Sequence, residues 1–465
     1  MRSRPLSRFT RFGYASAETG INAVEILLRL YLLSFYTDAV GLDPLWAGLA
    51  GFLGLLWDAV TDPLMGTLSD RTRPRLGGRR VYLLWGSVLL AGSLLLLFAP
   101  PALESQGARF LWLLGAYMLL NTALTVLSVP YMAMASELTE DRNERSVLFA
   151  LRFAFGNVGA IVAAGLPGVL LAGAEEGQAQ VVAMTRAGLV IGALVLLTSL
   201  LAWRATRNAE PEAAAASSQP LIRQLREALR NPAFGPLLGA YVIATFGVSI
   251  NSTLARYYYL YRLRFTEEQV GLLLATFMLI LTLSLVGWVK ASERLGKLKP
   301  LLWGVSLLGL GTSLTYPFFP AESFWLTLIV AGGVLGACVG SVVLLDSILT
   351  DVIDYDQLRS GASRAGVYFG VWRFASKTAR AAAFFGTGSV LSAIGFVPNT
   401  EQTPEVSEAL AWLFGPGVGG FLLLAALLLV RYRFSDAKQR QVKRLLERRL
   451  HRLETSPGVS PRAEA

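Results

Sequence analysis

Long apolar stretches separated by short polar links dominate the 465-residue chain. A helix of about 20 apolar residues spans the hydrocarbon layer of a bilayer, so stretches of this length are counted as membrane-spanning helices. The strands of a transmembrane barrel would instead be alternating segments of about 10 residues, and none occur. The pattern therefore predicts an all-α membrane protein with twelve transmembrane helices, at residues 15–38, 44–68, 81–99, 109–134, 147–172, 182–203, 236–258, 268–290, 300–318, 323–349, 365–393 and 408–430.

Basic residues gather in every second link, and this sets the expected orientation. Residues 71–80, 141–145 and 290–299 are rich in Arg and Lys, as are both ends of the chain. Because basic residues accumulate on the cytoplasmic side, both termini are expected in the cytoplasm of a multi-pass protein of the cell (inner) membrane. Three arginines break the pattern, because this topology places them outside: Arg256, Arg262 and Arg264.

A change of composition in the middle divides the chain into two halves of six helices each. We expect an N-terminal bundle at 1–203, a cytoplasmic linker with an amphipathic helix at 204–233, a C-terminal bundle at 234–431 and a basic cytoplasmic tail at 432–465. The loop RLGGRRVYLLWG at 75–86 recurs as RLGKLKPLLWG at 294–304, one half-chain later. Repeated halves are typical of transporters whose substrate site lies between them.

Composition removes several classes of function. The chain is 54% hydrophobic and only 16% charged, so its net charge of +10 reflects cytoplasmic loops and a lipid surface rather than a nucleic-acid partner. One cysteine, Cys338, and one histidine, His451, exclude a disulfide framework and a His-rich metal site. No phosphate-binding loop is present, so ATP-driven transport is not expected, and neither is a cofactor.

The candidate chemistry begins in the second predicted helix. Asp58 and Asp62 are four residues apart and therefore share a helix face, which Thr61 borders. Each ionised group at bilayer depth costs at least about 2.5–3.5 kcal/mol, so a pair on one face indicates a function. Carboxylate and hydroxyl oxygens suit a hard cation such as Na⁺, and a close acidic pair also holds a proton. The alternative is a pair of satisfied charges that locks helices together.

Other charges also fall within predicted spans. Glu25 and Arg29 have i,i+4 spacing and are expected to neutralise each other. Arg152 and Asp346 are isolated in the fifth and tenth spans. In the eleventh span, three basic residues share one face: Arg373, Lys377 and Arg380. Arg152 and Lys377 could bind substrate, or could bridge the halves to Asp58 and Asp62. The roles of Arg373, Arg380 and Asp346 stay open.

These residues resemble those of the glycoside–pentoside–hexuronide:cation symporters, the melibiose permease group of the major facilitator superfamily. The resemblance rests on YTDAVGL at 36–42, WDAVTDPLMG at 57–66, DVIDY at 351–355, FASK at 374–377 and IGFVPN at 394–399. It implies a cation site formed by Asp58, Thr61, Asp62 and Thr125. It also implies that Arg152 and Lys377 bind substrate.

The chain departs from this family at the sugar site. Asn22 and Ser128 stand where the family has acids, and Met132 stands where it has an aromatic residue that stacks on sugar. Trp372 and Arg373 replace smaller uncharged residues. The resemblance thus implies a retained cation site beside a rebuilt substrate site. Fewer acids and an extra arginine favour an anionic substrate such as a uronide.

Together these observations predict a secondary active transporter that couples Na⁺ or H⁺ to the symport of a sugar or glycoside by alternating access. One alternative is a carrier of lysolipid-like or drug-like amphiphilic anions. Another is a membrane sensor that does not transport. An enzyme is not expected, because Asp58 and Asp62 lie on one helix with no opposed partner across a substrate bond.

Overall fold

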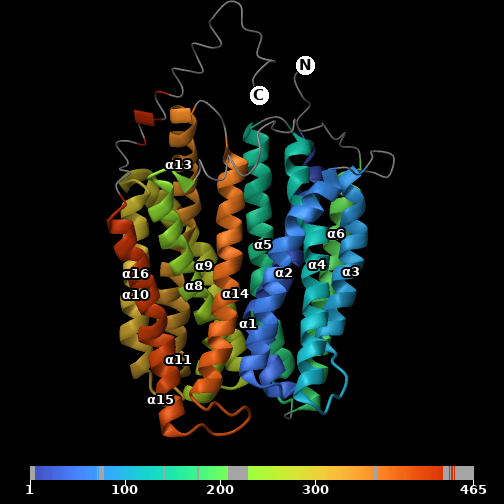
Figure 1. Cartoon of the computed structure of the whole chain (residues 1–465), viewed down its shortest axis with the longest axis vertical. Coiled ribbons are helices and arrows are strands. Elements are labelled where there is room, and N and C mark those ends of the chain that lie inside the picture. The colour runs from blue at the N-terminus through green and yellow to red at the C-terminus, as the bar shows by residue number, and fades with distance from the viewer. Residues whose placement is uncertain are drawn as a thin grey trace, which may run out of the picture.

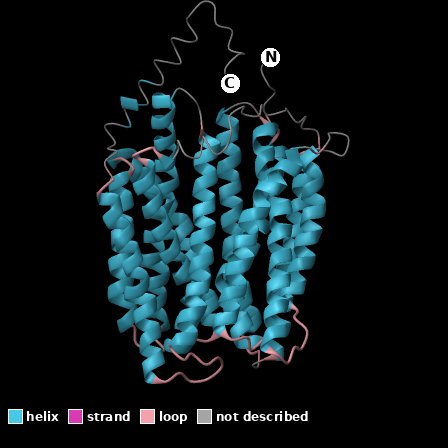
Figure 2. Ribbon diagram, viewed as in Figure 1, coloured by secondary structure: helices cyan, strands magenta, loops and turns pink. Residues whose placement is uncertain are grey.

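The computed structural model describes residues 6–70, 72, 78–139, 142–174, 177–207, 229–360 and 364–432, and also 439, 441, 442 and 445. Within these ranges the chain is helical throughout and has no strand (Figure 2). This agrees with the all-α prediction. The linker helix expected near 221–229 and most of the tail at 432–465 lie outside the described residues and stay predictions, as do the boundaries of the two bundles.

Six long helices form the first half of the chain, and each contains one predicted span to within a residue. They are α1 (Arg8–Ser34), which continues as η1 (Phe35–Ala39); α2 (Pro44–Asp70); α3 (Val81–Phe98), preceded by η3 (Gly78–Arg80); α4 (Gln106–Leu138); α5 (Arg142–Leu171); and α6 (Gln178–Ala205).

The second half follows the same plan with more interruptions. It contains α8 (Phe234–Tyr257) with η4 (Tyr258–Arg262); α9 (Glu267–Leu295); and α10 (Leu298–Thr315) with η5 (Tyr316–Phe318). One long helical segment then runs through α11 (Phe324–Thr327), η6 (Leu328–Leu335), α12 (Gly336–Val339), η7 (Gly340–Val343) and α13 (Leu344–Ser360). The last helices are α14 (Ala365–Ala393) and α15 (Pro404–Trp412), the latter joined through η8 (Leu413–Gly417) to α16 (Val418–Val430).

Ten helical segments of the described part are long and apolar enough to cross a membrane. The two long helices that do not meet this criterion are α1 and α14. Three charged residues of α1, Glu18, Glu25 and Arg29, and three of α14 lower their hydropathy. The helices that deviate from the apolar pattern are therefore those that bring charge into the bundle.

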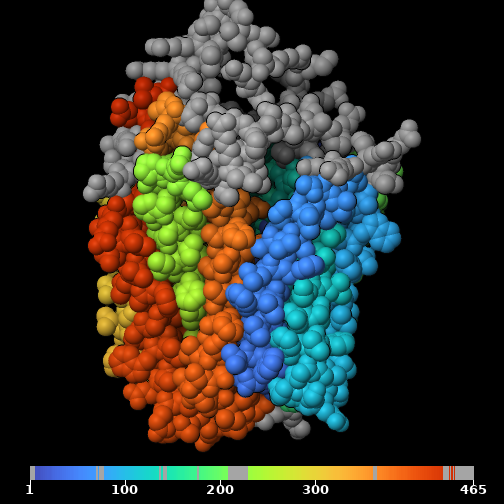
Figure 3. All heavy atoms as spheres, in the orientation of Figure 1, coloured from blue at the N-terminus to red at the C-terminus, as the bar shows by residue number. Residues whose placement is uncertain are grey.

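Most contacts of α1–α6 and of α8–α16 lie within each set, so the two halves of the chain form two groups of helices, although α14 packs most extensively on α2 of the other group (Figure 1). Three helix pairs join the groups: α1 with α8, α2 with α14, and α5 with α9. In the space-filling view, α2 and α14 lie side by side across the front of the molecule (Figure 3).

Glycines bring the two groups together at the end of the bundle opposite the termini. A Cβ atom on Gly168 of α5 would lie 2.5 Å from the Cα of Gly271 in α9. A Cβ on Gly388 of α14 would collide with the carbonyl oxygen of Pro44 in α2. No larger residue fits at these positions, so this end is closed by direct contact between helix backbones.

The Trp-Gly pair that ends the repeated sequence has a similar structural role in both halves. Trp85 and Trp303 face outward, with 69% and 55% of their surfaces exposed. The glycines that follow them face inward: Gly86 packs on Leu127 of α4, and Gly304 packs on Ser341 of η7. A large apolar residue thus faces the surroundings while its small neighbour allows close helix packing in each half.

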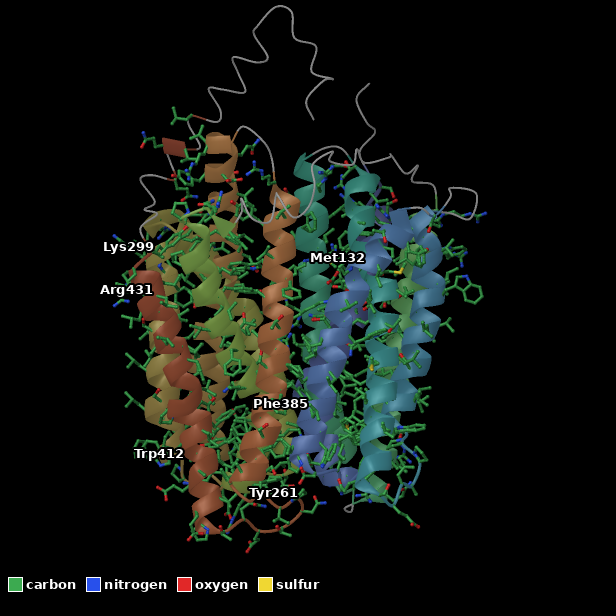
Figure 4. All side chains as sticks on the ribbon, in the orientation of Figure 1. Met132, Tyr261, Lys299, Phe385, Trp412 and Arg431 are labelled. Carbon is green, nitrogen blue, oxygen red and sulfur yellow. The ribbon has the colours of Figure 1, made fainter. Side chains whose placement is uncertain are left out.

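Two basic residues of the second half lie at one end of the bundle. Lys299 and Arg431 lie toward the end where the termini emerge, and Tyr261 lies at the opposite end (Figure 4). The exceptional Arg256 is buried near Tyr261's end, where it makes two hydrogen bonds of 2.7 and 2.8 Å to Glu267. Its guanidinium also lies 5.1 Å from the centre of the Tyr31 ring. Arg256 is therefore a neutralised, buried group and carries no information about the side of the membrane.

Candidate functional site

A central cavity of about 250 Å³ lies between the two groups of helices. Residues of α1, α2, α4, α5, α8 and α14 line it. Five basic and four acidic side chains take part in the lining, which is an unusual density of charge inside a membrane-spanning bundle. They are Arg29, Arg152, Arg373, Lys377 and Arg380, and Glu18, Glu25, Asp58 and Asp62.

The aspartate pair of α2 faces the lysine of α14 across the boundary between the halves. Lys377 Nζ lies 2.7 Å from Asp58 Oδ2 and also binds Asp62 Oδ2. Asp58 is buried, and Asp62 and Lys377 are partly buried. The ammonium therefore offsets the repulsion between two carboxylates that sit one helical turn apart. This cluster links the two halves of the chain through two ion pairs.

A hydroxyl of α4 completes the cluster. Thr125 Oγ1 lies 2.8 Å from Asp58 Oδ1 and 2.9 Å from Asp62 Oδ1. Since a hydroxyl has one proton, it donates to one carboxylate at a time. Thr61 is placed differently: its hydroxyl donates to the backbone carbonyl of Asp58 at 3.2 Å, and the residue does not line the cavity. Of the four expected cation ligands, the structure brings three together.

The arrangement offers carboxylate and hydroxyl oxygens to a hard cation. Among the described residues, no group of three or more His, Cys, Asp or Glu side chains could form a metal site. A cation at Asp58 and Asp62 would therefore have fewer protein ligands than a structural metal and would keep water. The Lys377 ammonium already occupies the side of the pair that faces α14, so a bound cation would compete with it.

Arg152 has a partner of its own. Its Nε and Nη2 atoms lie 2.8 and 2.7 Å from Glu18 Oε2, and its guanidinium lies 4.7 Å from the centre of the Tyr131 ring. Arg152 is buried. The expected bridge from Arg152 to the aspartate pair is therefore not formed in this structure, because Glu18 of α1 is nearer and neutralises it.

Glu25 faces α14 rather than its neighbour on α1. Glu25 Oε2 lies 3.9 Å from Arg380 Nη1. The expected pair between Glu25 and Arg29 is not among the ion pairs of the described residues. Arg29 lines the cavity without a hydrogen bond or ion pair to any described residue. It is a guanidinium in the middle of the bundle whose charge is not matched by a contacting acid.

Trp372 and Arg373 lie on different sides of α14. Trp372 is buried behind the cavity wall, where it stacks on Tyr241 with ring centres 3.7 Å apart and donates a hydrogen bond of 2.7 Å to Asp346. It does not line the cavity, whereas Tyr241 does. Arg373 lines the cavity and is exposed, and like Arg29 it makes no hydrogen bond or ion pair within the described part of the chain.

The remaining predicted substrate residues divide between two cavities. Ser128 and Met132 of α4 line the central cavity. Asn22 instead lines a second cavity, and its side chain donates to the backbone carbonyl of Gly156 at 2.7 Å. The sequence did not predict that Arg29 would lack an ion-pair partner among the described residues. It also did not predict that Tyr117 and Asn121 of α4 line the cavity. The tyrosine and the asparagine gave no signal, because neither is unusual in a membrane helix.

Comparison with known proteins identifies the family of the chain. Residues 13–436 match the family described as MFS/sugar transport protein. The chain belongs to this family. It is therefore a multi-pass membrane transporter of the major facilitator superfamily and not an enzyme, as the motifs at 36–42 and 57–66 indicated.

Two relatives and one solved structure extend the comparison. The uncharacterized symporter YnaJ of Bacillus subtilis is 27% identical over 460 residues, which cover 96% of each chain. The glucuronide carrier protein homolog of Escherichia coli is 26% identical over 453 residues, which cover 95% of each chain. A bacterial homologue of the human lysosomal transporter Spinster, in an inward-facing and unoccupied conformation, aligns with a TM-score of 0.63 over 95% of this chain and 96% of that one. At 15% identity this likeness shows the fold alone.

Proposed function

We propose that the protein is a cation-coupled symporter of an anionic sugar or glycoside, such as a uronide. The observation that carries this proposal is the charge balance of the central cavity. The four acids contact three of the five basic residues, and two guanidiniums have no contact with an acid of the described residues: Arg29 and Arg373. A substrate carboxylate would supply the missing charge, and the planar fork of an arginine fits a carboxylate with two hydrogen bonds.

The coupling ion, Na⁺ or H⁺, binds at Asp58 and Asp62 with Thr125, and Thr61 supports the helix turn beneath them. The ion takes over part of the charge that Lys377 neutralises when the site has no ion. This weakens the link between α2 and α14 and lets the halves move relative to each other. An ion drives this change only through its different affinity for the two states of the carrier.

The substrate binds in the same cavity, beside the ion. Arg29 of α1 binds its carboxylate, while Arg373 of α14, Ser128, Met132 and Tyr241 contact the rest of the sugar. The relative from Escherichia coli whose name refers to glucuronide supports a uronide as cargo. Arg152 contacts Glu18 and Tyr131 and so fixes the positions of these two side chains in the cavity lining.

We further propose that α1 and α14 also cross the membrane, which makes twelve transmembrane helices in an inner membrane with both termini in the cytoplasm. The basic residues at the terminal end support this orientation. The end closed by Gly168, Gly271 and Gly388 then faces outside. On this reading, the structure corresponds to an inward-facing state of the alternating-access cycle.

Uptake into proteoliposomes tests the proposal. Radiolabelled glucuronate is offered with an imposed Na⁺ gradient, with a pH gradient, or with neither, and neutral galactoside is used as a competitor. We expect glucuronate to accumulate against its own gradient with one of the two cations and galactoside to compete poorly. Galactoside that outcompetes glucuronate, or uptake indifferent to both gradients, would contradict the proposal. Vesicles with Glu401→Gln, a carboxylate on the exposed outer loop, are the matched control and should behave as wild type.

A further inference from the structure

A second cavity of about 290 Å³ borders α1 next to the central cavity. Glu18, Ile21, Glu25 and Leu28 of α1 line the central cavity, whereas Asn22 and Ile26 line the second. These two sets follow helical spacing and occupy different faces of α1. Arg29 belongs to both linings. The two cavities therefore border neighbouring faces of α1, and the side chain they share is Arg29, whose guanidinium has no ion-pair partner among the described residues.

The second cavity differs from the first in its chemistry. Its lining is largely aliphatic and aromatic, from α5, α8, α9, α10, α16 and the segment before α13; examples are Phe277, Met278, Leu281, Leu308 and Val339. Apart from Arg29, no charged side chain of the described residues lines it.

Three polar side chains of its lining already donate hydrogen bonds to backbone carbonyl oxygens. Asn157 donates to the carbonyl of Phe153 at 2.9 Å, and Ser252 donates to the carbonyl of Val248 at 3.0 Å. Asn22 donates to the carbonyl of Gly156. A ligand in this cavity would therefore meet mainly apolar surface, with one positive charge at the boundary with the central cavity.

We propose that this second cavity binds the apolar aglycone of an anionic glycoside, whose sugar lies in the central cavity and whose carboxylate binds Arg29. The proposal rests on the proposed symport of uronides and extends it. An apolar group that leaves water for such a lining gains binding free energy in proportion to its buried area. The cargo is thus a uronic acid conjugate rather than a free sugar acid.

The size of the second cavity limits the aglycone. Cavities that enclose drug-sized ligands measure roughly 300–1,000 Å³, so 290 Å³ is at the small end of this range. A phenyl or short alkyl group is of suitable size, and the long acyl chain of a lysolipid is not. The backbone contact between Gly168 and Gly271 also closes α5 against α9 beyond the cavity.

The test compares phenyl glucuronide with free glucuronate in cation-driven uptake and in competition. In wild-type protein, phenyl glucuronide should bind about tenfold more tightly than glucuronate, which is the order of discrimination an apolar pocket provides. Val248→Phe, on the α8 wall, fills the cavity. This variant should lose the tenfold preference and keep glucuronate uptake, which also shows that the variant folds. Val286→Phe, a position of α9 that is 59% exposed on the outer surface of the bundle, is the matched control and should keep the preference.

Val339→Phe fills the same cavity from another segment and should act as Val248→Phe does. Equal affinity of wild-type protein for the two ligands would overturn the aglycone site and leave the symporter proposal standing. The aglycone site would also be overturned if both cavity-filling variants kept the preference for phenyl glucuronide. The same holds if both variants lost affinity for the two ligands equally. Absence of uptake of either uronide by wild-type protein would instead overturn the proposed function itself, and the aglycone site with it.

Discussion

The charged side chains of the central cavity fall into two groups, which differ in whether a side chain of opposite charge is in contact with them. On the side of α2, Asp58 and Asp62 are in contact with Lys377, so acid and base satisfy each other across the two halves. Arg29 of α1 and Arg373 of α14 also line the cavity, and neither contacts an acid in the part of the chain that the structure describes. If these charges served only to hold the two halves together, each charged side chain of the cavity would contact a side chain of opposite charge.

This difference separates charges that link the halves from charges that are available to a ligand. A paired charge costs about 3–5 kcal/mol when one partner is removed in a buried site. An unpaired guanidinium in a cavity keeps water, and an arriving carboxylate replaces that water. The first group is suited to coupling by a cation and the second to recognition of an anion.

The largest effect is expected at the paired side. Asp58→Asn and Asp62→Asn remove an ion ligand and leave Lys377 with half of its partners. Wild-type protein should gain about 2.7 kcal/mol of unfolding free energy from its coupling ion at 100 times the dissociation constant. Both variants should gain almost none, as measured by thermal unfolding in detergent with and without Na⁺ and across pH. If the ion stabilised both variants as much as wild-type protein, the ion would not bind at this site.

A smaller effect is expected on the unpaired side. Arg29→Gln removes charge-assisted hydrogen bonds worth about 1.5–3 kcal/mol, so glucuronate should bind about 10- to 100-fold more weakly. Binding of a neutral glycoside should change little, and Arg29→Lys, which keeps the charge without the fork, should lie between. Competition binding to purified protein measures all three. If the neutral glycoside weakened as much as glucuronate, Arg29 would be a structural residue.

The smallest effects come from the two threonines, and they differ from each other. Thr125→Val removes the hydroxyl that bonds both aspartates and should raise the ion concentration for half-maximal uptake about tenfold. Thr61→Val removes only a bond to the backbone of its own helix and should change that concentration less than about twofold. Both substitutions keep the branched shape of the side chain. An equal effect at both positions would show that Thr61 reaches the ion in another state of the carrier.

Much of the charge arrangement in the central cavity could be predicted from the sequence. A charge inside an apolar stretch is energetically costly, so its presence there indicates a function. The spacing of Asp58 and Asp62 predicted a shared face, and the spacing of Arg373, Lys377 and Arg380 predicted another. All five side chains line the central cavity. Thr125 could not be found from spacing, since it comes from another helix, and only the family resemblance indicated it.

The errors have a common physical cause. Pairs at i,i+4 on one helix are worth only about 0.2–0.5 kcal/mol, so a partner on a neighbouring helix easily replaces them. Glu25 therefore faces Arg380, and Arg29 is released. Trp372 and Arg373 are consecutive, and consecutive residues of a helix do not face the same way, so only Arg373 lines the cavity. Asn22 follows the same rule, because it lies on the face of α1 that borders the second cavity.

The central claim is that a cation bound at the aspartate pair drives transport of the cargo. Its most direct test is uptake of glucuronate by proteoliposomes containing Asp58→Cys or Asp62→Cys, with exchange of labelled for unlabelled substrate measured in the same vesicles. We predict that both variants lose accumulation driven by the cation gradient. If both variants still accumulate glucuronate when the cation gradient is imposed, the claim is contradicted.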